Sequence, residues 1–122
     1  MNDRKLRYAV VGASNNTKKY GYIICDFMRQ NNISFIPVNP KETEICGRTC
    51  FPDFLDLDVD VLIFVVPTNI SMKLIKTIWK SKCKRVWFQH GSFDYKVVGY
   101  CKKNKIKYNS DECIMVHLRQ EF

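Results

Sequence analysis

The residues best suited to chemistry in this sequence lie in a turn that follows its first apolar stretch. The turn and the start of the next apolar stretch carry small, basic and aromatic residues: Gly12, Ala13, Ser14, Lys19, Tyr20 and Gly21. A buried strand that passes through a glycine turn into a helix presents backbone N–H groups and the positive end of the helix dipole at one point. The turn therefore predicts a binding site for a phosphate-bearing ligand, with the helix beginning near residues 19–20.

The spacing within this turn differs from the dinucleotide fingerprint Gly-x-Gly-x-x-Gly. Ser14 stands in place of the second glycine, and Gly21 follows Gly12 by nine positions. We expect a longer loop in which Ser14 and the start of the helix meet a pyrophosphate. Gly21 is expected to let the helix and the strand approach closely, as the last glycine of the fingerprint does.

Four further apolar stretches also end in turns, at residues 39–41, 67–69, 89–91 and 109–111. Ligands of open α/β sheets bind outside the carboxyl ends of the strands, near the point where the strand order reverses. The second strand ends in Asn39-Pro40-Lys41, where an NAD site usually has an acid for the ribose hydroxyls. Lys41 therefore favours a ligand with a phosphate on its ribose, such as NADP or coenzyme A, although Glu42 is a weak candidate for the acid.

Strands and helices alternate along the chain to position these turns. Short β-branched runs predict strands at residues 6–11, 33–38, 59–66, 85–89 and 106–108. Apolar residues at helical spacing predict helices at 20–32, from a cap at Thr68 or Asn69, and from a cap at Ser92 or Asp94. A short extended piece is expected at 48–51, a turn of helix at 53–57 and a last apolar piece at 113–116.

This alternation is typical of right-handed parallel crossover units with helices on both faces of the sheet. We therefore predict an α/β chain that forms a single Rossmann-like domain over residues 1–122, with an open, mostly parallel sheet of five or six strands. A hydrophobic content of 46% and a charged content of 26% are typical of a soluble globular protein. No run approaches the ~20 apolar residues needed to cross a bilayer, and the N-terminus does not resemble a signal peptide, so a cytoplasmic location is expected.

The formal net charge of +8 fits an anionic ligand, a nucleic acid or simply a soluble surface, of which the last is the most common cause. Basic residues are spread along the sequence except for a cluster at 102–107. The six cysteines include no Cys-x-x-Cys pair and are accompanied by only two histidines, a pattern that does not predict a metal site. Cys25, Cys83 and Cys101 fall at expected core positions.

The chain resembles the single-domain CoA-binding proteins, whose domain is similar to the CoA-binding domain of the succinyl-CoA ligase alpha subunit. The resemblance runs from about Tyr8 to Val116 and is carried by Val11-Gly12-Ala13-Ser14, Lys19-Tyr20-Gly21, Pro37-Val38-Asn39-Pro40-Lys41, Gly47, Asp60, Lys84 to Trp87, Gln89, Gly91, Asp111, Cys113 and Ile114. It implies a domain that binds coenzyme A or an acyl-CoA as a non-catalytic or regulatory module.

The resemblance also implies where the parts of CoA would lie. The pyrophosphate would lie at Gly12–Ser14 and Lys19–Gly21, and the 3′-phosphate or adenosine would lie near Lys41, beside Asn39 and Pro40. The adenine and ribose would lie along Val66, Pro67 and Thr68. The pantetheine arm would pass by Gln89 and Gly91. Apart from the resemblance, two roles are open for Cys113: a buried thiol near the last strand, which is the commoner case, or a thiol that faces the CoA thiol and forms a mixed disulfide with it.

The chain departs from the family pattern at three points. Family members often have one or two arginines after the third main strand, where this chain has Phe64-Val65-Val66-Pro67. Glu112 stands where a basic residue is common between Asp111 and Cys113. His90 stands where an apolar residue is usual. His90 is either a ligand-facing residue or, more commonly, a neutral loop histidine. The phosphorylated histidine of the related ligases belongs to a second domain, so the chain is not expected to act as a ligase alone, and no catalytic residue is predicted.

Two other functions stay open at this point. An NADP-binding oxidoreductase-like domain is compatible with Lys41 but lacks visible catalytic residues. A nucleic-acid-binding protein is compatible with the basic cluster at 102–107, which is flanked by Tyr100 and Tyr108. A protein partner or a homo-oligomer is a third open question, for which Trp79 and Trp87 are candidate contact residues.

Overall fold

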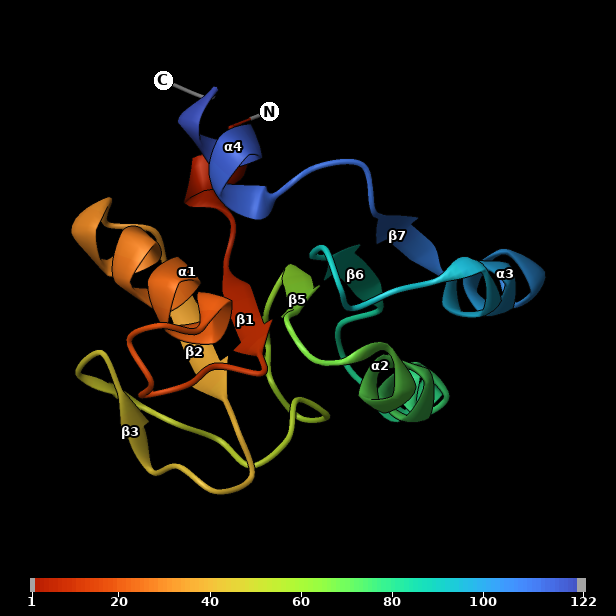
Figure 1. Cartoon of the computed structure of the whole chain (residues 1–122), viewed down its shortest axis with the longest axis horizontal. Coiled ribbons are helices and arrows are strands. Elements are labelled where there is room, and N and C mark those ends of the chain that lie inside the picture. Colours follow the sequence, from red (N-terminus) through yellow and green to blue (C-terminus); the bar gives the residue numbers. More distant parts are fainter. Residues whose placement is uncertain (1, 121–122) are drawn as a thin grey trace.

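The computed structural model describes residues 2–120 and is built on a five-stranded parallel sheet (Figure 1). In spatial order the strands are β2 (Phe35–Val38), β1 (Tyr8–Val11), β5 (Val61–Phe64), β6 (Arg85–Phe88) and β7 (Lys107–Asn109). All neighbouring strands pair in parallel. A separate antiparallel pair, β3 (Glu44–Ile45) and β4 (Arg48–Thr49), follows β2. The predicted α/β, Rossmann-like architecture is confirmed, with five strands in its sheet.

Helices cover both faces of the sheet (Figure 1). On one face lie α1 (Tyr20–Gln30) and α4 (Ile114–Arg119), and on the other α2 (Thr68–Ile75) and α3 (Tyr95–Lys103). Short 3-10 helices, η1 (Asp3–Lys5) and η2 (Ile78–Lys80), precede β1 and follow α2. Because both faces are covered, β1 and β5 are buried at every position, which explains their continuous apolar sequences.

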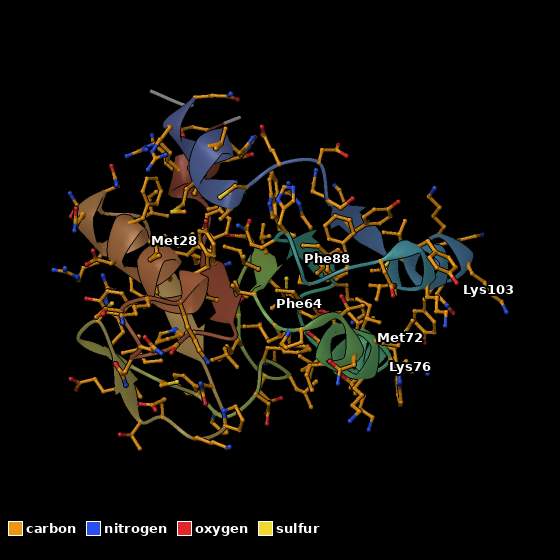
Figure 2. The ribbon with its side chains drawn as sticks, viewed as in Figure 1. Met28, Phe64, Met72, Lys76, Phe88 and Lys103 are labelled. Atoms are coloured by element: carbon orange, nitrogen blue, oxygen red, sulfur yellow. The ribbon has the colours of Figure 1, made fainter. Side chains whose placement is uncertain are left out.

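Alternate strand residues enter two separate cores. Met28 of α1 belongs to one core, whereas Phe64 and Phe88 belong to the other; Figure 2 labels all three. The Phe64 ring lies 5.5 Å from that of Phe88 in an edge-on arrangement and 5.8 Å from that of Phe54. These offset aromatic contacts are the geometry that the ring quadrupoles favour.

The strand order reverses between β1 and β5. From β1 the chain crosses to β2 on one side, while β5, β6 and β7 follow one another on the other side. Two crossovers therefore leave in opposite directions from neighbouring strands, and a crevice opens outside the carboxyl ends of those strands. Gly12 and Val65 are the residues that follow β1 and β5 at this crevice.

Several element boundaries differ from those predicted. The strands expected at 6–11 and 59–66 are shorter, at Tyr8–Val11 and Val61–Phe64. The helical turn expected at 53–57 is wrong: the segment forms a non-helical turn in which the Leu57 N–H donates to the Phe54 carbonyl at 3.2 Å. The apolar piece expected at 113–116 contains the start of α4.

The two predicted helix caps have different outcomes. Asp94 caps α3 as expected, because its carboxylate accepts hydrogen bonds from the N–H groups of Lys96 and Val97. The cap predicted at Thr68 or Asn69 is wrong, since Pro67 occupies the cap position of α2 without a side-chain bond. The Thr68 hydroxyl instead donates to the Gly91 carbonyl at 3.3 Å and ties α2 to the turn after β6.

Within residues 2–120, no helix is long and apolar enough to cross a membrane.

Candidate functional site

A cavity of about 690 Å³ lies at the carboxyl edge of the sheet, beside the point where the strand order reverses. Its walls come from the start of α1, the turns after β5 and β6, and the residue before α4: Lys19, Tyr20, Val65, Val66, Pro67, Gln89, His90, Gly91 and Cys113. Seven of these nine were predicted as site residues. Val65 and His90 complete the lining.

Gly12 determines how closely the turn after β1 approaches the turn after β5. Its φ angle is +100°, and a Cβ atom placed on it would lie 2.3 Å from the Val65 carbonyl oxygen. The N–H groups of Gly12 and Ala13 both donate to the Val38 carbonyl, at 3.0 and 3.2 Å, which fixes the turn against β2. Any side chain at position 12 would therefore separate the strands at the crevice.

Gly21 has the matching role on the helix. A Cβ atom at this position would lie 2.1 Å from the Gly12 carbonyl oxygen, so α1 rests directly on the glycine turn. The predicted close approach of helix and strand is thus confirmed. Lys19 occupies the cap position of α1 without a side-chain capping bond. The Tyr22 N–H donates to the Lys19 carbonyl at 3.0 Å, whereas the N–H groups of Tyr20 and Gly21 precede the first bonds of the helix. The helix begins at the end of the cavity that Lys19 and Tyr20 line, so the positive end of its dipole lies there.

The loop between Gly12 and α1 is held by its own polar side chains. The Ser14 hydroxyl accepts the Asn16 N–H at 3.0 Å, and the Asn16 side chain accepts the Lys18 N–H at 3.0 Å. The Asn15 amide donates to the Glu42 carboxylate and to the Glu44 carbonyl. The acid weighed as a ribose ligand, Glu42, is therefore bonded to this loop, and Ser14 lies beside the cavity instead of in its wall.

The turn after β2 supports the site from the neighbouring strand. The Asn39 amide donates to the Ala13 carbonyl at 2.8 Å, and its oxygen accepts the Lys41 N–H at 2.7 Å. Pro40 and Lys41 are exposed and lie outside the cavity lining. The structure thus brings Asn39 against the glycine turn but leaves Lys41 on the surface next to it, where only a ligand part that extends beyond the cavity would meet it.

The opposite end of the cavity is organised by a buried amide. Gln89 is 5% exposed, and its Nε2 donates to the Cys113 Sγ at 3.2 Å while its Oε1 accepts the Ile114 N–H at 2.7 Å. These bonds attach the turn after β6 to the start of α4 and hold the Cys113 thiol in the cavity wall. Cys113 as a whole is half-buried.

A histidine lies behind Cys113. His117 Nε2 is 2.7 Å from Asp3 Oδ2, its Nδ1 is 3.1 Å from Glu112 Oε1, and its ring packs 5.0 Å from that of Trp87. Burial lowers the pKa of His117, but the hydrogen bonds to both carboxylates raise it by more, so the net pKa lies above its ordinary value. The Glu112 carboxylate is thus bonded to His117, a partner that the sequence did not indicate.

The remaining lining residues differ in how readily the sequence revealed them. Val65 lies within a continuous apolar run, and the sequence does not indicate where in that run the strand ends and the cavity lining begins. His90 is exposed and lies between two predicted site residues, Gln89 and Gly91, so its place in a strand-end turn was the available signal. Thr68 and Lys41 were predicted site residues that the cavity wall does not include.

The cysteines predicted for the core are buried, and burial raises the pKa of each. Cys25, Cys83 and Cys101 are affected in this way, with the pKa of Cys101 raised to about 11. Thiols in such surroundings are poor nucleophiles at neutral pH. In the described part of the chain, no group of three or more histidine, cysteine or acidic side chains has an arrangement that could hold a metal ion.

Sequence comparison matches this chain to proteins that handle coenzyme A. A family model described as a CoA binding domain matches residues 6–119. An ADP-forming acetate–CoA ligase from Methanocaldococcus jannaschii is 34% identical over 101 residues, which cover 81% of this chain and 14% of the ligase. The chain therefore spans only a small part of the length of the ligases that it matches.

Solved structures show the same fold. A conserved hypothetical protein from Pyrococcus furiosus superimposes with a TM-score of 0.86 at 35% identity, covering 92% of this chain and 98% of that protein. A hypothetical protein from Pyrococcus horikoshii gives a TM-score of 0.82 at 26% identity, covering 96% and 84% of the two chains.

Proposed function

The chain belongs to the CoA binding domain family, and on that premise we propose that it binds coenzyme A or an acyl-CoA in the cavity at the carboxyl edge of the sheet. One observation carries the proposal: a single cavity joins the uncapped start of α1 to a thiol held by Gln89. The first suits a phosphate group and the second suits the end of a thiol-bearing arm. Coenzyme A has both, whereas NADP has no thiol arm.

The phosphate end would be bound by backbone and lysine together. The N–H groups of Tyr20 and Gly21, the first two residues of α1, would donate to the pyrophosphate. Lys18, Lys19 and Lys41 are exposed around this end, and in the part of the chain that the structure covers none of them has a carboxylate within 4 Å. Their charges are therefore available to the pyrophosphate and to the phosphate on the CoA ribose.

The pantetheine arm would follow the apolar wall of the cavity. Val65, Val66 and Pro67 supply that wall between the start of α1 and the turn after β6. The volume of about 690 Å³ lies within the range of roughly 300–1,000 Å³ that is typical of small-molecule sites. An arm laid along this wall would bring its thiol or thioester to Gln89 and Cys113.

We further propose that the chain binds CoA without transforming it. The cavity lining contains one histidine, His90, and no serine or carboxylate with which it could form a catalytic group among the described residues. The ligase activity named for the relatives is a property of much longer proteins. A carrier or regulatory module is the function that this lining supports.

A thermal-shift panel with CoA, acetyl-CoA, NAD and NADP tests the proposal. A ligand at about a hundred times its Kd stabilises the folded state by about 2.7 kcal/mol, which corresponds to a rise in Tm on the order of 10 °C for a domain of this size. We expect such a shift with CoA or acetyl-CoA and a smaller one with NAD or NADP. No shift at millimolar CoA, or a larger shift with NADP, would overturn the proposal.

A further inference from the structure

A second cavity, of about 400 Å³, opens at the opposite edge of the sheet. It lies where β6 and β7 begin, between η2 and the end of α3. Figure 1 shows α2 and α3 side by side on this face. Because the candidate CoA site lies at the carboxyl ends of the strands, a ligand in this second cavity would not compete with one in the first.

The second cavity has an apolar floor and an aromatic wall. Ile75 and Ile78 are buried in the floor, and Ile106 is half-buried beside them. Tyr100 and Trp79 form the wall, and Trp79 is 70% exposed. An exposed tryptophan beside a concave apolar surface is the arrangement that anchors protein–protein contacts. Of the two tryptophans considered for an interface, Trp87 is buried and only Trp79 is available.

The rim of the cavity is strongly basic. Lys84, Lys105 and Lys107 line it, and its described lining contains no acidic residue. Residues 61–110 hold eleven of the twenty Lys and Arg residues of the chain and a single acid, Asp94, which is engaged in capping α3. This segment of the chain is therefore strongly basic, and two of its lysines, Lys76 just after α2 and Lys103 at the end of α3, are labelled in Figure 2.

The acids at the same edge of the sheet do not neutralise this rim. Asp58 and Asp60 both form ion pairs with Arg7, at 3.1 and 3.4 Å. In the described chain, Lys105 and Lys107 have no carboxylate within 4 Å. The positive field of the rim therefore remains open to an outside partner.

Lys105 follows the cap residue of α3 in the left-handed conformation, with a φ angle of +55°. Glycine or asparagine is the usual residue at such a position, because a larger side chain raises the energy of this conformation. The Lys105→Gly substitution would therefore lower the energy of the backbone at this position, and it would also remove the lysine charge from the rim. This position allows the role of the charge to be separated from the stability of the fold.

We propose that this cavity is the docking site for an acidic segment of a partner protein, in which an apolar residue is flanked by carboxylates. The apolar residue would lie on the isoleucine floor against Trp79, and the carboxylates would meet the lysines of the rim. A nucleic acid fits less well, because the Lys80 ammonium already lies over the Trp79 ring, 5.3 Å from its centre.

The proposal is tested by selecting binders from a random peptide library that is displayed on phage. The library is selected on the full chain and then depleted on the Trp79→Ala variant. We expect the remaining peptides to share a large apolar residue between acidic residues. Enrichment of peptides without acidic residues, or failure to enrich any that discriminate between the two proteins, would overturn the proposal.

Fluorescence anisotropy with one enriched peptide then identifies the contacts. Lys105→Gly and Lys107→Gln should each weaken binding by about threefold or more, since each removes one charge contact. Lys5→Gln removes the same charge from the exposed Lys5 in η1, which lies outside the lining of the second cavity, and should leave binding unchanged. Lys105→Gly should not lower the Tm, so its effect on binding cannot come from unfolding.

Two results would assign the surface to a different occupant and overturn the proposal. The first is that a single-stranded oligonucleotide binds the chain more tightly than the peptides do, and that its affinity for the chain falls in the Trp79→Ala variant. The other is concentration-dependent dimerisation in sedimentation experiments that is lost with Lys105→Gly, which would make a second copy of this chain the occupant. Saturating CoA should change neither the selected peptides nor their affinity.

Discussion

Two glycines of this chain are subject to opposite constraints, and alanine tests both. A Cβ atom on Gly12 would lie 2.3 Å from a backbone carbonyl oxygen, and its φ angle is +100°. Gly99 lies in α3, where a Cβ atom added to it would meet no neighbouring segment within 4 Å. Gly12→Ala should therefore destabilise the fold by about 2 kcal/mol or more, whereas Gly99→Ala should stabilise it by about 0.5–1 kcal/mol.

Urea unfolding followed by circular dichroism measures both changes. The account of the glycine turn is contradicted if Gly12→Ala unfolds at the same urea concentration as the unsubstituted protein.

Lys41 is the residue that tests where the phosphates lie. It is exposed beside the candidate site, and its own N–H bonds to Asn39. Lys41→Glu should weaken CoA binding by about threefold to tenfold, because it replaces an attraction to phosphate with a repulsion. Lys76→Glu makes the same charge change at the end of α2 and should have little effect. Calorimetric titration with CoA measures both, and equal affinities would show that no phosphate lies near Lys41.

Cys113 is the residue placed to react with the thiol end of the ligand. With oxidised CoA as the co-reactant, the Cys113 thiolate would attack the CoA disulfide, form a protein–CoA mixed disulfide and release one CoA thiolate. Mass spectrometry should then show a gain of one CoA, which is absent in Cys113→Ser and present in Cys46→Ser. Cys46 is the matched control because it is the other half-buried cysteine of the chain. Equal labelling of the Cys113→Ser variant would exclude this reaction at Cys113.

At the scale of elements, His117 connects η1 to α4 through Asp3 and Glu112. Its pKa is raised in the folded protein, so its contribution to stability is complete at a pH below its ordinary pKa of 6.5 and is lost as the pH rises through the folded pKa. Because the side chain is partly exposed, the effect should be on the order of 0.5 kcal/mol.

Urea unfolding between about pH 5.5 and pH 8 checks this linkage. The unsubstituted protein should lose more stability over this interval than His117→Gln does. If both proteins show the same pH dependence, the histidine does not stabilise the contact between η1 and α4.

Sequence periodicity was sufficient to predict the order of the main elements, because the central strands of the sheet are apolar on both faces and every long helix is apolar on one. It was less accurate at boundaries. Residues 53–57 have helical spacing of Phe54 and Leu57, yet a turn buries both without a helix. Thr68 has the chemistry of a helix cap, but its hydroxyl bonds to Gly91, a residue distant in sequence.

Site residues could be predicted where the signal lies in neighbouring positions of the sequence. They could not be predicted where their role depends on contacts between distant segments. Gly12 and Gly21 carry a signal in their spacing, and the close contact between them follows from that spacing. The bonds of Gln89 to Cys113 and Ile114 join segments about 25 residues apart, which no local pattern encodes. The second cavity was missed for the same reason, since its lysines come from two separate segments.

At the scale of the whole molecule, the two edges of the sheet carry different surfaces. The carboxyl edge holds the candidate CoA site, with the start of α1 and the Cys113 thiol at its two ends. The amino edge holds the basic second cavity, around Trp79. A module of this kind would bind its small molecule and its partner at once, and the sheet between them would keep the two sites apart.

The central claim, that CoA occupies the cavity at the carboxyl edge, is tested most directly by calorimetric titration of CoA into two tyrosine variants. Tyr20 and Tyr95 are the first residues of α1 and α3, and both are largely exposed, at 63% and 81%. Of the two, Tyr20 alone lines the cavity. We expect one CoA to bind per chain, Tyr20→Ala to weaken its affinity by about tenfold, and Tyr95→Ala to leave it unchanged. The absence of CoA binding, or equal affinities for the two variants, would contradict the account.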